Sequence, residues 1–234
     1  MMKAKVLHNN TKDWAIGIAK EVSSFLKSAK VQEVEKGADF TIVIGGDGTI
    51  LFHKNELEGA VFGIGSERSH VCQCREENWK PRLQSFLQNP KAEERILLSI
   101  SMGGREIGFA INDAAFLSRD HNMLNIHIDI GGSSRSFPGD GLIVSTPTGS
   151  TAYAYSAGGA TMDESLEAIE LVPLAPYKRS FEPMVISAQR EIKITAEQPC
   201  HLLIDGQQLV QLKEKTPVTI GKHKRKIAFA EAGK

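Results

Sequence analysis

The chain has 234 residues, of which 41% are hydrophobic and 24% are charged, and its 28 Lys and Arg residues balance 28 Asp and Glu residues. This size and composition are typical of a globular protein with its own hydrophobic core, and they exclude an intrinsically disordered chain. A net charge of zero argues against nucleic acid or an anionic membrane surface as the main partner. The three cysteines are too few for a disulfide framework, which predicts a cytoplasmic location, and no apolar run approaches the roughly 20 residues of a membrane-spanning helix.

The first part of the chain alternates between strand and helix patterns. Residues 5–8 predict an opening strand, and apolar residues at helical spacing predict a helix over residues 14–30. Phe40–Ile44 is an apolar run without alternation, which is typical of a strand buried on both faces of a parallel sheet. A similar run at residues 60–64 and a helix from Trp79 follow. Residues 1–91 are therefore predicted to form an α/β domain.

Beyond Pro90 the pattern becomes mostly β. Strand-like runs separated by glycine and proline lie at residues 96–100, 107–111, 125–130, 142–145, 191–195 and 201–204. The helical interruption that we predict runs from about residue 151 to residue 157. Residues 92–234 are therefore predicted to form a second, β-rich domain, and the short basic cluster at residues 222–226 is interpreted as a loop between its closing strands.

A glycine-rich loop directly follows the predicted strand Phe40–Ile44. Its residues are Gly45, Gly46, Asp47, Gly48 and Thr49. Glycines at the carboxyl end of a parallel strand let backbone amides approach phosphate oxygens, and a helix that starts there favours negative charge. A carboxylate repels phosphate unless it holds Mg²⁺ or accepts a proton from a nucleophile, so Asp47 indicates phosphate chemistry. The alternative is a glycine turn in which Asp47 caps the next helix.

A second polar segment follows Gly139, Asp140 and Gly141. After the predicted strand at residues 142–145 come several hydroxyl side chains and then Tyr153. Hydroxyls and free amides at the start of a helix can bind a polar ligand, and a tyrosine ring can stack on a base. The alternative, an ordinary N-capped helix ended by glycine, explains one hydroxyl and the terminal glycines only.

Together these residues resemble the NAD kinase family. Gly45 to Thr49 is similar to the first glycine-aspartate motif of that family, and residues 139–159 look like its long signature. Asn112-Asp113 stands where the family has Asn-Glu, and Asp205-Gly206-Gln207 matches a fourth motif. The resemblance implies an NAD kinase-like two-domain fold, in which a Rossmann-like α/β domain is followed by a β-sandwich-like domain.

The resemblance also implies an activity, in which the 2′-hydroxyl of the adenosine ribose of NAD is phosphorylated to give NADP. ATP or polyphosphate would be the donor, Mg²⁺ or another divalent metal the cofactor, and the protein a homodimer or homotetramer. Asp47 would be catalytic. The implied NAD-binding residues are Gly48, Asn112, Asp113, Asp140, Thr148, Thr151, Ala152, Tyr153, Ala154, Tyr155, Ser156, Ala175 and Gln207. The implied phosphate-donor residues are Gly45, Gly46 and Thr49, with His53, Lys54 and Arg68 as further cations.

The chain departs from the family pattern at three places. The loop after the second parallel strand, residues 63–70, keeps only its glycines, and a polar sequence replaces an apolar wall. Phe52 stands where many members have an arginine, and Asp113 replaces a glutamate. These departures leave open a non-catalytic or degenerate NAD(P)-binding protein, and the glycine-aspartate loop alone is also compatible with a lipid or sugar kinase. No protein ligand set for a metal is predicted, because His70, Cys72 and Cys74 are too few for a structural site.

Overall fold

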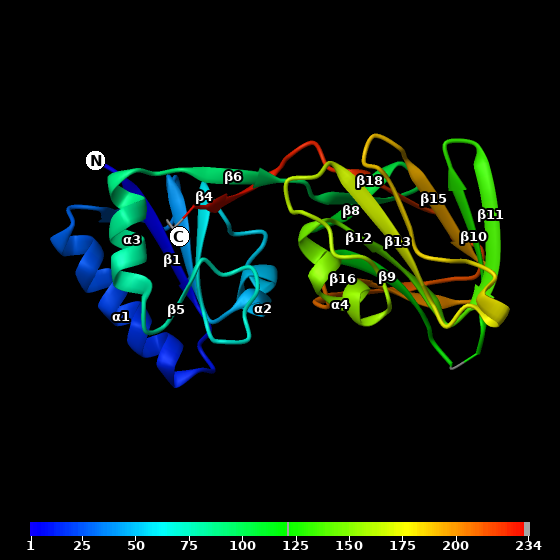
Figure 1. Cartoon of the computed structure of the whole chain (residues 1–234), viewed down its shortest axis with the longest axis horizontal. Helices are drawn as coiled ribbons and strands as arrows, with labels where there is room; N and C mark the ends of the chain where they lie inside the picture. Colours follow the sequence, from blue (N-terminus) through cyan, green and yellow to red (C-terminus); the bar gives the residue numbers. More distant parts are fainter. Residues whose placement is uncertain (121, 232–234) are drawn as a thin grey trace. The chain divides into compact units, whose positions relative to one another are not determined.

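The computed structural model describes residues 1–120 and 122–231, and the chain divides into two compact units (Figure 1). Unit 1 comprises Met1–Glu94 and the segment that begins at Ile227, and unit 2 comprises Arg95–Lys226. The sequence placed all residues after 91 in the second domain. The structure differs at the end of the chain, because strand β19 (Ile227–Ala230) pairs in parallel with β4 (Ala60–Gly65) of unit 1.

Unit 1 is built on one sheet with the strand order β2-β1-β3-β4-β19-β6, and β5 pairs with β4. Its remaining strands are β1 (Lys3–His8), β2 (Gln32–Glu33), β3 (Phe40–Ile44), β5 (Cys74–Arg75) and β6 (Ala92–Arg95). Every residue of β3 is buried, as the absence of alternation predicted, because helices cover the sheet on both sides. The predicted α/β architecture of this part of the chain is confirmed.

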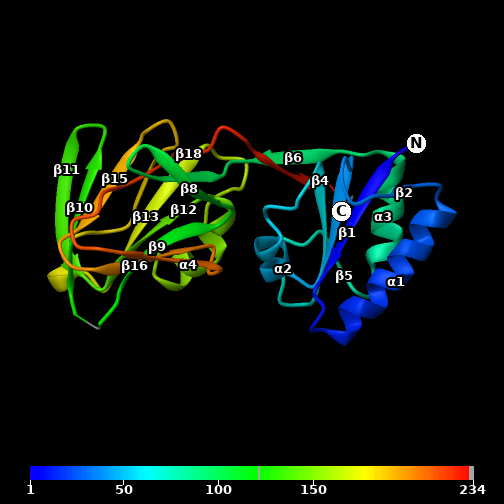
Figure 2. The same cartoon turned by 180° about the vertical axis from the view of Figure 1, so that it is seen from behind.

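The helices of unit 1 divide between the two faces of the sheet. Helices α1 (Asp13–Ser28) and α3 (Trp79–Gln88) lie on one side, and the short helix α2 (Asp47–Phe52) lies on the other (Figures 1 and 2). Phe25 of α1 contacts Trp79 of α3 edge to face, with 5.7 Å between the ring centroids. No helix in residues 1–120 and 122–231 is long and apolar enough to span a membrane.

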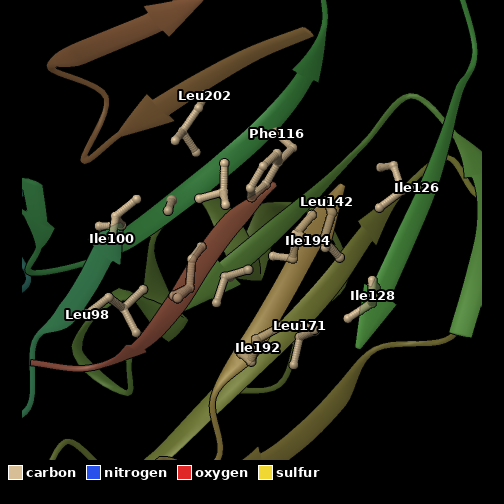
Figure 3. Close-up of a cluster of buried hydrophobic side chains, with 14 of the residues drawn as sticks. Leu98, Ile100, Phe116, Ile126, Ile128, Leu142, Leu171, Ile192, Ile194 and Leu202 are labelled. Carbon is tan, nitrogen blue, oxygen red and sulfur yellow. The ribbon is translucent and has the colours of Figure 1, made fainter. Parts of the chain in front are cut away.

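Unit 2 consists of two six-stranded antiparallel sheets, ordered β11-β10-β15-β18-β7-β8 and β14-β13-β12-β9-β16-β17. The first contains β7 (Leu98–Met102), β8 (Arg105–Ala110), β10 (Leu124–Ile130), β11 (Ser133–Gly139), β15 (Ile192–Ala196) and β18 (Val218–Lys222). The second contains β9 (Asp113–Ser118), β12 (Gly141–Ser145), β13 (Ala168–Leu174), β14 (Met184–Ser187), β16 (Cys200–Ile204) and β17 (Gln208–Leu212). Apolar side chains of both sheets form one buried cluster (Figure 3). This arrangement confirms the predicted sandwich.

The helix predicted near residues 151–157 is shorter and interrupted. A 3₁₀-helix, η1 (Thr148–Thr151), is followed by α4 (Tyr153–Ser156), and Ala152 between them has non-helical dihedrals of −100° and −122°. A second 3₁₀-helix, η2 (Tyr177–Arg179), follows β13. The hydroxyl groups of this segment therefore stand on a tight, irregular turn and not on the continuous helix that the sequence predicted.

Candidate functional site

The glycine-rich loop connects β3 to α2. Gly45 and Gly46 have φ angles of 144° and 103°, a conformation that side-chain-bearing residues rarely adopt. A Cβ atom on Gly45 would also overlap the hydroxyl of Thr49. The Thr49 hydroxyl is buried and has no hydrogen-bond partner among the described residues. Glycine is therefore required in this loop by its backbone conformation and by its close packing, and one buried hydroxyl still lacks a partner.

The carboxylate of Asp47 is held by three consecutive backbone amides. Its Oδ2 accepts a hydrogen bond from the N–H of His70 at 2.6 Å, and its Oδ1 accepts from Val71 at 3.1 Å and Cys72 at 3.2 Å. No side-chain cap is formed at the start of α2, so Asp47 orders the distant loop and does not cap its own helix. A carboxylate has about four acceptor positions, which leaves roughly one for a further donor such as a hydroxyl group.

The loop that supplies these amides packs against two glycines of β4. A Cβ atom on Gly65 would overlap the side chain of Ser69, and one on Gly63 would lie 3.0 Å from Cys72 Cα. This close packing explains why only the glycines of the family pattern remain here. Burial, reinforced by the Asp47 carboxylate, raises the pKa of the Cys72 thiol, and burial raises the pKa of Cys74 to about 12. Neither cysteine is therefore a thiolate nucleophile at neutral pH.

Asp205 in unit 2 holds a second loop in the same way. Its side chain is 4% exposed, and its Oδ1 accepts from the amides of Asn112 at 2.8 Å and Asp113 at 3.3 Å. Its Oδ2 accepts from Ile111 at 3.0 Å. The backbone of Asp205 has a φ of 53°, within the turn that leads to Gly206. The position of the Asn112-Asp113 pair is thus fixed by a buried carboxylate distant in the sequence.

The hydroxyl-rich segment after β12 packs directly on Asn112. The amide of Thr146 donates to the Asn112 carbonyl at 2.8 Å, and the Thr146 hydroxyl donates to the Ile111 carbonyl at 2.6 Å. A Cβ atom on Gly149 would overlap the Asn112 carbonyl, so this position requires glycine. The side-chain Oδ1 of Asn112 is buried and has no hydrogen-bond partner among the described residues. It can accept a hydrogen bond from a polar ligand.

A cavity of about 450 Å³ lies beside this segment within unit 2. It is lined by Leu117, Ser118, Asp140, Tyr153, Leu174 and Ala175. The structure thus brings together three residues that the sequence predicted, Asp140, Tyr153 and Ala175. Ala175 has a φ of 43°, a strained conformation that often marks a functional site. The volume is suited to part of a dinucleotide.

Comparisons with known proteins identify the family. The family model described as the ATP-NAD kinase C-terminal domain matches residues 114–232. An NAD kinase from Methanoculleus marisnigri is 33% identical over 226 residues, which cover 94% of this chain and 84% of that protein. The chain belongs to the NAD kinase family. The family resemblance predicted from the sequence is therefore confirmed.

Two solved structures have the same fold as this chain. The crystal structure of an NAD kinase from Archaeoglobus fulgidus in complex with ATP matches with a TM-score of 0.87 and 29% identity, covering 99% of this chain and 94% of that chain. Yeast NADH kinase complexed with NADH matches with a TM-score of 0.85 over 98% of this chain and 83% of that chain, and at 18% identity this likeness shows the fold alone. The chain is an enzyme of the NAD kinase family, and the lipid or sugar kinase alternative finds no support in these matches.

The remaining NAD-binding residues predicted in unit 2 differ in how exposed they are. Thr148 and Ala154 are buried, whereas Thr151, Tyr155, Ser156 and Gln207 are exposed and Ala152 is half-buried. None of these seven side chains belongs to the lining of the 450 Å³ cavity, although Tyr153 of α4 does. Gly48 in unit 1 is exposed beside Asp47.

The cations predicted to contact the phosphate donor lie in different surroundings. His53 Nδ1 lies 2.8 Å from Glu56 Oε1, and Arg68 is exposed. Lys54 is only 6% exposed, whereas Phe52 is 68% exposed. Lys12 was not predicted from the sequence, and its Nζ donates to the Gly45 carbonyl at 2.9 Å. Its place just after the first parallel strand could have indicated it, because strand ends on one edge of a parallel sheet lie together.

Glu170 supports the segment that follows α4. The side chain is 1% exposed, its Oε1 accepts from the amide of Ala160 at 2.6 Å, and its Oε2 has no hydrogen-bond partner among the described residues. Burial raises the pKa of this carboxyl above its usual range, although the Ala160 hydrogen bond opposes the shift. Protonated Glu170 is therefore favoured more strongly in the folded protein than in the unfolded chain.

This raised pKa predicts a loss of stability as pH increases. Below the ordinary glutamate pKa of about 4.3 both states are protonated, and the folded protein loses stability as pH rises from there through its own raised value. We expect Glu170→Gln to remove this part of the pH dependence. Urea unfolding midpoints of both proteins, measured from about pH 4 to about pH 8, test it, and parallel pH curves for the two proteins would contradict it.

Proposed function

We propose that this chain transfers a phosphoryl group to the 2′-hydroxyl of the adenosine ribose of NAD and so forms NADP. The observation that carries the proposal is the Asp47 carboxylate, which three backbone amides hold beside the glycine loop with room for about one more hydrogen bond. A hydroxyl group is the donor that this position accepts, and the glycine amides suit the phosphates that would react with it.

Asp47 would act as the general base. The ribose oxygen forms a bond to the terminal phosphorus of the donor, the bond from that phosphorus to the leaving phosphate oxygen breaks, and the hydroxyl proton passes to the Asp47 carboxylate. Such assistance contributes about 10²-fold to 10⁴-fold, and the rest of the acceleration comes from positioning and charge neutralisation. The amide cradle of Asp47 supports this role because it fixes the direction of the carboxylate before the substrate binds.

Unit 2 would bind the dinucleotide. Asn112 Oδ1 and the Asp113 carboxylate would contact adenosine and ribose groups, and Asp140 and Ala175 the nicotinamide end. Tyr153 presents a partly exposed ring to the cavity, where it would stack on a base. The adenine surroundings would be completed by Thr148, Thr151, Ala152, Ala154, Tyr155, Ser156 and Gln207.

The phosphate donor, ATP or polyphosphate, would bind at the loop of Gly45 and Gly46, through the Gly46 amide and the Thr49 hydroxyl, because the Gly45 amide donates to the Ile64 carbonyl at 3.0 Å. Gly48 would contact the NAD. Mg²⁺ or another divalent metal would neutralise the charge of the donor. Across residues 1–120 and 122–231 there is no group of three or more His, Cys, Asp or Glu side chains that could hold a metal. Mg²⁺ is commonly bound by substrate phosphates together with only one or two carboxylates. We also propose a cytoplasmic homodimer or homotetramer; the location is supported by three buried, free cysteines.

Lys12 is expected to contribute to binding of the phosphate donor. Its ammonium group binds the Gly45 carbonyl and has further protons for a phosphate oxygen. We expect Lys12→Ala to raise the KM for ATP by about threefold to tenfold, since an exposed charge contact is worth roughly 1 kcal/mol. Steady-state kinetics with ATP varied at saturating NAD measure this, and the control is Lys20→Ala, an exposed lysine of α1, the helix that Lys12 precedes. An unchanged KM for ATP would remove Lys12 from the donor site.

The proposed function is tested by incubating the purified protein with NAD, Mg²⁺ and either ATP or polyphosphate, and by measuring NADP formation. A parallel titration of NAD binding separates the alternatives. Formation of NADP, lost in the Asp47→Asn variant, is the expected result. Tight NAD binding without turnover would instead identify a degenerate NAD-binding protein, and the product obtained with each donor shows which one the enzyme accepts.

A further inference from the structure

The loop that holds Asp47 is itself held from the other side by Arg75. Arg75 lies in β5, where it is opposite Gly65 in the parallel pairing with β4. Its Nη2 donates to the carbonyl of Ser69 at 2.8 Å, and its Nη1 donates to the carbonyl of Cys72 at 3.3 Å. One guanidinium group therefore bridges the two ends of the turn whose amides bind Asp47.

The first of these contacts connects Arg75 to Asp47 through a single peptide group. The carbonyl of Ser69 and the amide of His70 belong to the same peptide unit, which accepts from Arg75 at its oxygen and donates to Asp47 Oδ2 at its nitrogen. A cation at the carbonyl and a carboxylate at the amide polarise the peptide in the same direction, and each hydrogen bond strengthens the other. The 2.6 Å amide contact is the shortest of the three that Asp47 receives.

A neutral side chain supports a second peptide unit of the turn in the same way. Gln73 Nε2 donates to the Val71 carbonyl at 2.9 Å, and the amide of the same peptide unit, that of Cys72, donates to Asp47 Oδ1. Gln73 Oε1 accepts from the amide of Gly63 in β4 at 2.6 Å, which ties the turn to the sheet. Two of the three peptide groups that bind Asp47 are thus oriented by side chains on their carbonyl side.

We infer that Arg75 is a positioning residue for phosphoryl transfer: it orients the backbone amides that fix the Asp47 carboxylate. The inference rests on the proposed function, in which Asp47 is the base. Arg75 acts through the peptide and not on the substrate. Lysine cannot replace it fully, because a single ammonium group lacks the planar fork that reaches both carbonyls.

The first test is kinetic. In Arg75→Ala we expect kcat to fall by about tenfold to a hundredfold, because small misplacements of reacting groups have effects of this size, while the KM for NAD changes little. Arg75→Lys should retain an intermediate kcat. Guanidinium ion added at millimolar concentration should restore part of the activity of Arg75→Ala and none of Asp47→Asn. The exposed Arg105→Ala in β8 is the matched control and should behave like the unchanged protein.

The second test needs no turnover. Amide hydrogen exchange of residues 70–72 should be faster in Arg75→Ala than in the unchanged protein, while the rest of unit 1 keeps its protection. A folded Arg75→Ala variant with unchanged kcat, or with unchanged exchange at these amides, would overturn the inference. A fall in kcat accompanied by an equal rise in the KM for NAD, without guanidinium rescue, would also overturn it. If the unchanged protein makes no NADP, the proposed function fails, and the exchange experiment still decides whether Arg75 orders the Asp47-binding amides.

Discussion

Asp47→Asn is expected to lower the turnover of NAD to NADP by at least about 10²-fold, the lower end of what a general base contributes, while NAD affinity changes by no more than about threefold. An asparagine retains one acceptor oxygen for the loop amides, but it cannot take the proton of the ribose hydroxyl. Its NH₂ group would also face a backbone N–H that now donates to the carboxylate. Steady-state kcat and an NAD titration measure the two quantities separately.

Asp39→Asn is the matched control for this variant. Asp39 lies in the same unit and its Oδ2 also accepts a backbone amide, that of Lys3, at 2.7 Å. If both variants lose turnover equally, the loss reflects damage to unit 1 and not to the chemistry. Unchanged turnover in Asp47→Asn would remove Asp47 from its catalytic role.

Replacement of Asp205 is expected to have a large effect on the stability of unit 2 and on the KM for NAD. In Asp205→Ala three buried amides, those of residues 111–113, lose their charged acceptor, and we expect the free energy of unfolding to fall by about 3 kcal/mol or more. In Asp205→Asn one oxygen remains, and the amide group in place of Oδ2 opposes the N–H of Ile111. We expect this milder variant to raise the KM for NAD about tenfold, which corresponds to roughly 1.4 kcal/mol.

Urea unfolding and steady-state kinetics test these two effects, with Asp129→Asn as control. Asp129 accepts from the amide of Gly132 and the hydroxyl of Ser134 in a different turn of unit 2. The Asp129→Asn variant therefore also loses a carboxylate that orders a turn. A normal KM for NAD in a folded Asp205→Asn variant would show that the Asn112-Asp113 pair does not contact the substrate.

Local patterns predicted some of the buried strands and missed others, among them β9 and β13 of unit 2. Phe40–Ile44 has the same bounds in the structure as in the sequence prediction, because an apolar run without alternation is sufficient to identify a strand buried on both faces. Strand β11 (Ser133–Gly139) was not predicted. It is an edge strand of the first sheet in unit 2, with four exposed residues at its start, so it has little of the apolar alternation on which such predictions depend.

The candidate site was predicted only as a set of motifs. Asp47 was identified from the loop around it, but the amides that hold it lie more than 20 residues further along the chain and contribute through their backbone. The contact therefore cannot be predicted from the identity of the side chains at these positions. The role of Asp205 could not be predicted for the same reason. Its partners at residues 111–113 are backbone amides, and they are separated from it by more than 90 residues. Family resemblance indicated both aspartates without indicating what they bind.

The return of β19 to the first sheet determines the order in which the protein can be completed during synthesis. The ribosome makes β1 to β6 first, then the whole of unit 2, and only afterwards β19, which pairs with β4 in the sheet that carries the glycine loop. Although domains generally fold as they emerge, unit 1 must remain one strand short until the whole of unit 2 has been synthesised. A deletion that begins at Ile227 would consequently damage the unit made first and leave intact the β-sandwich that directly precedes the deleted strand.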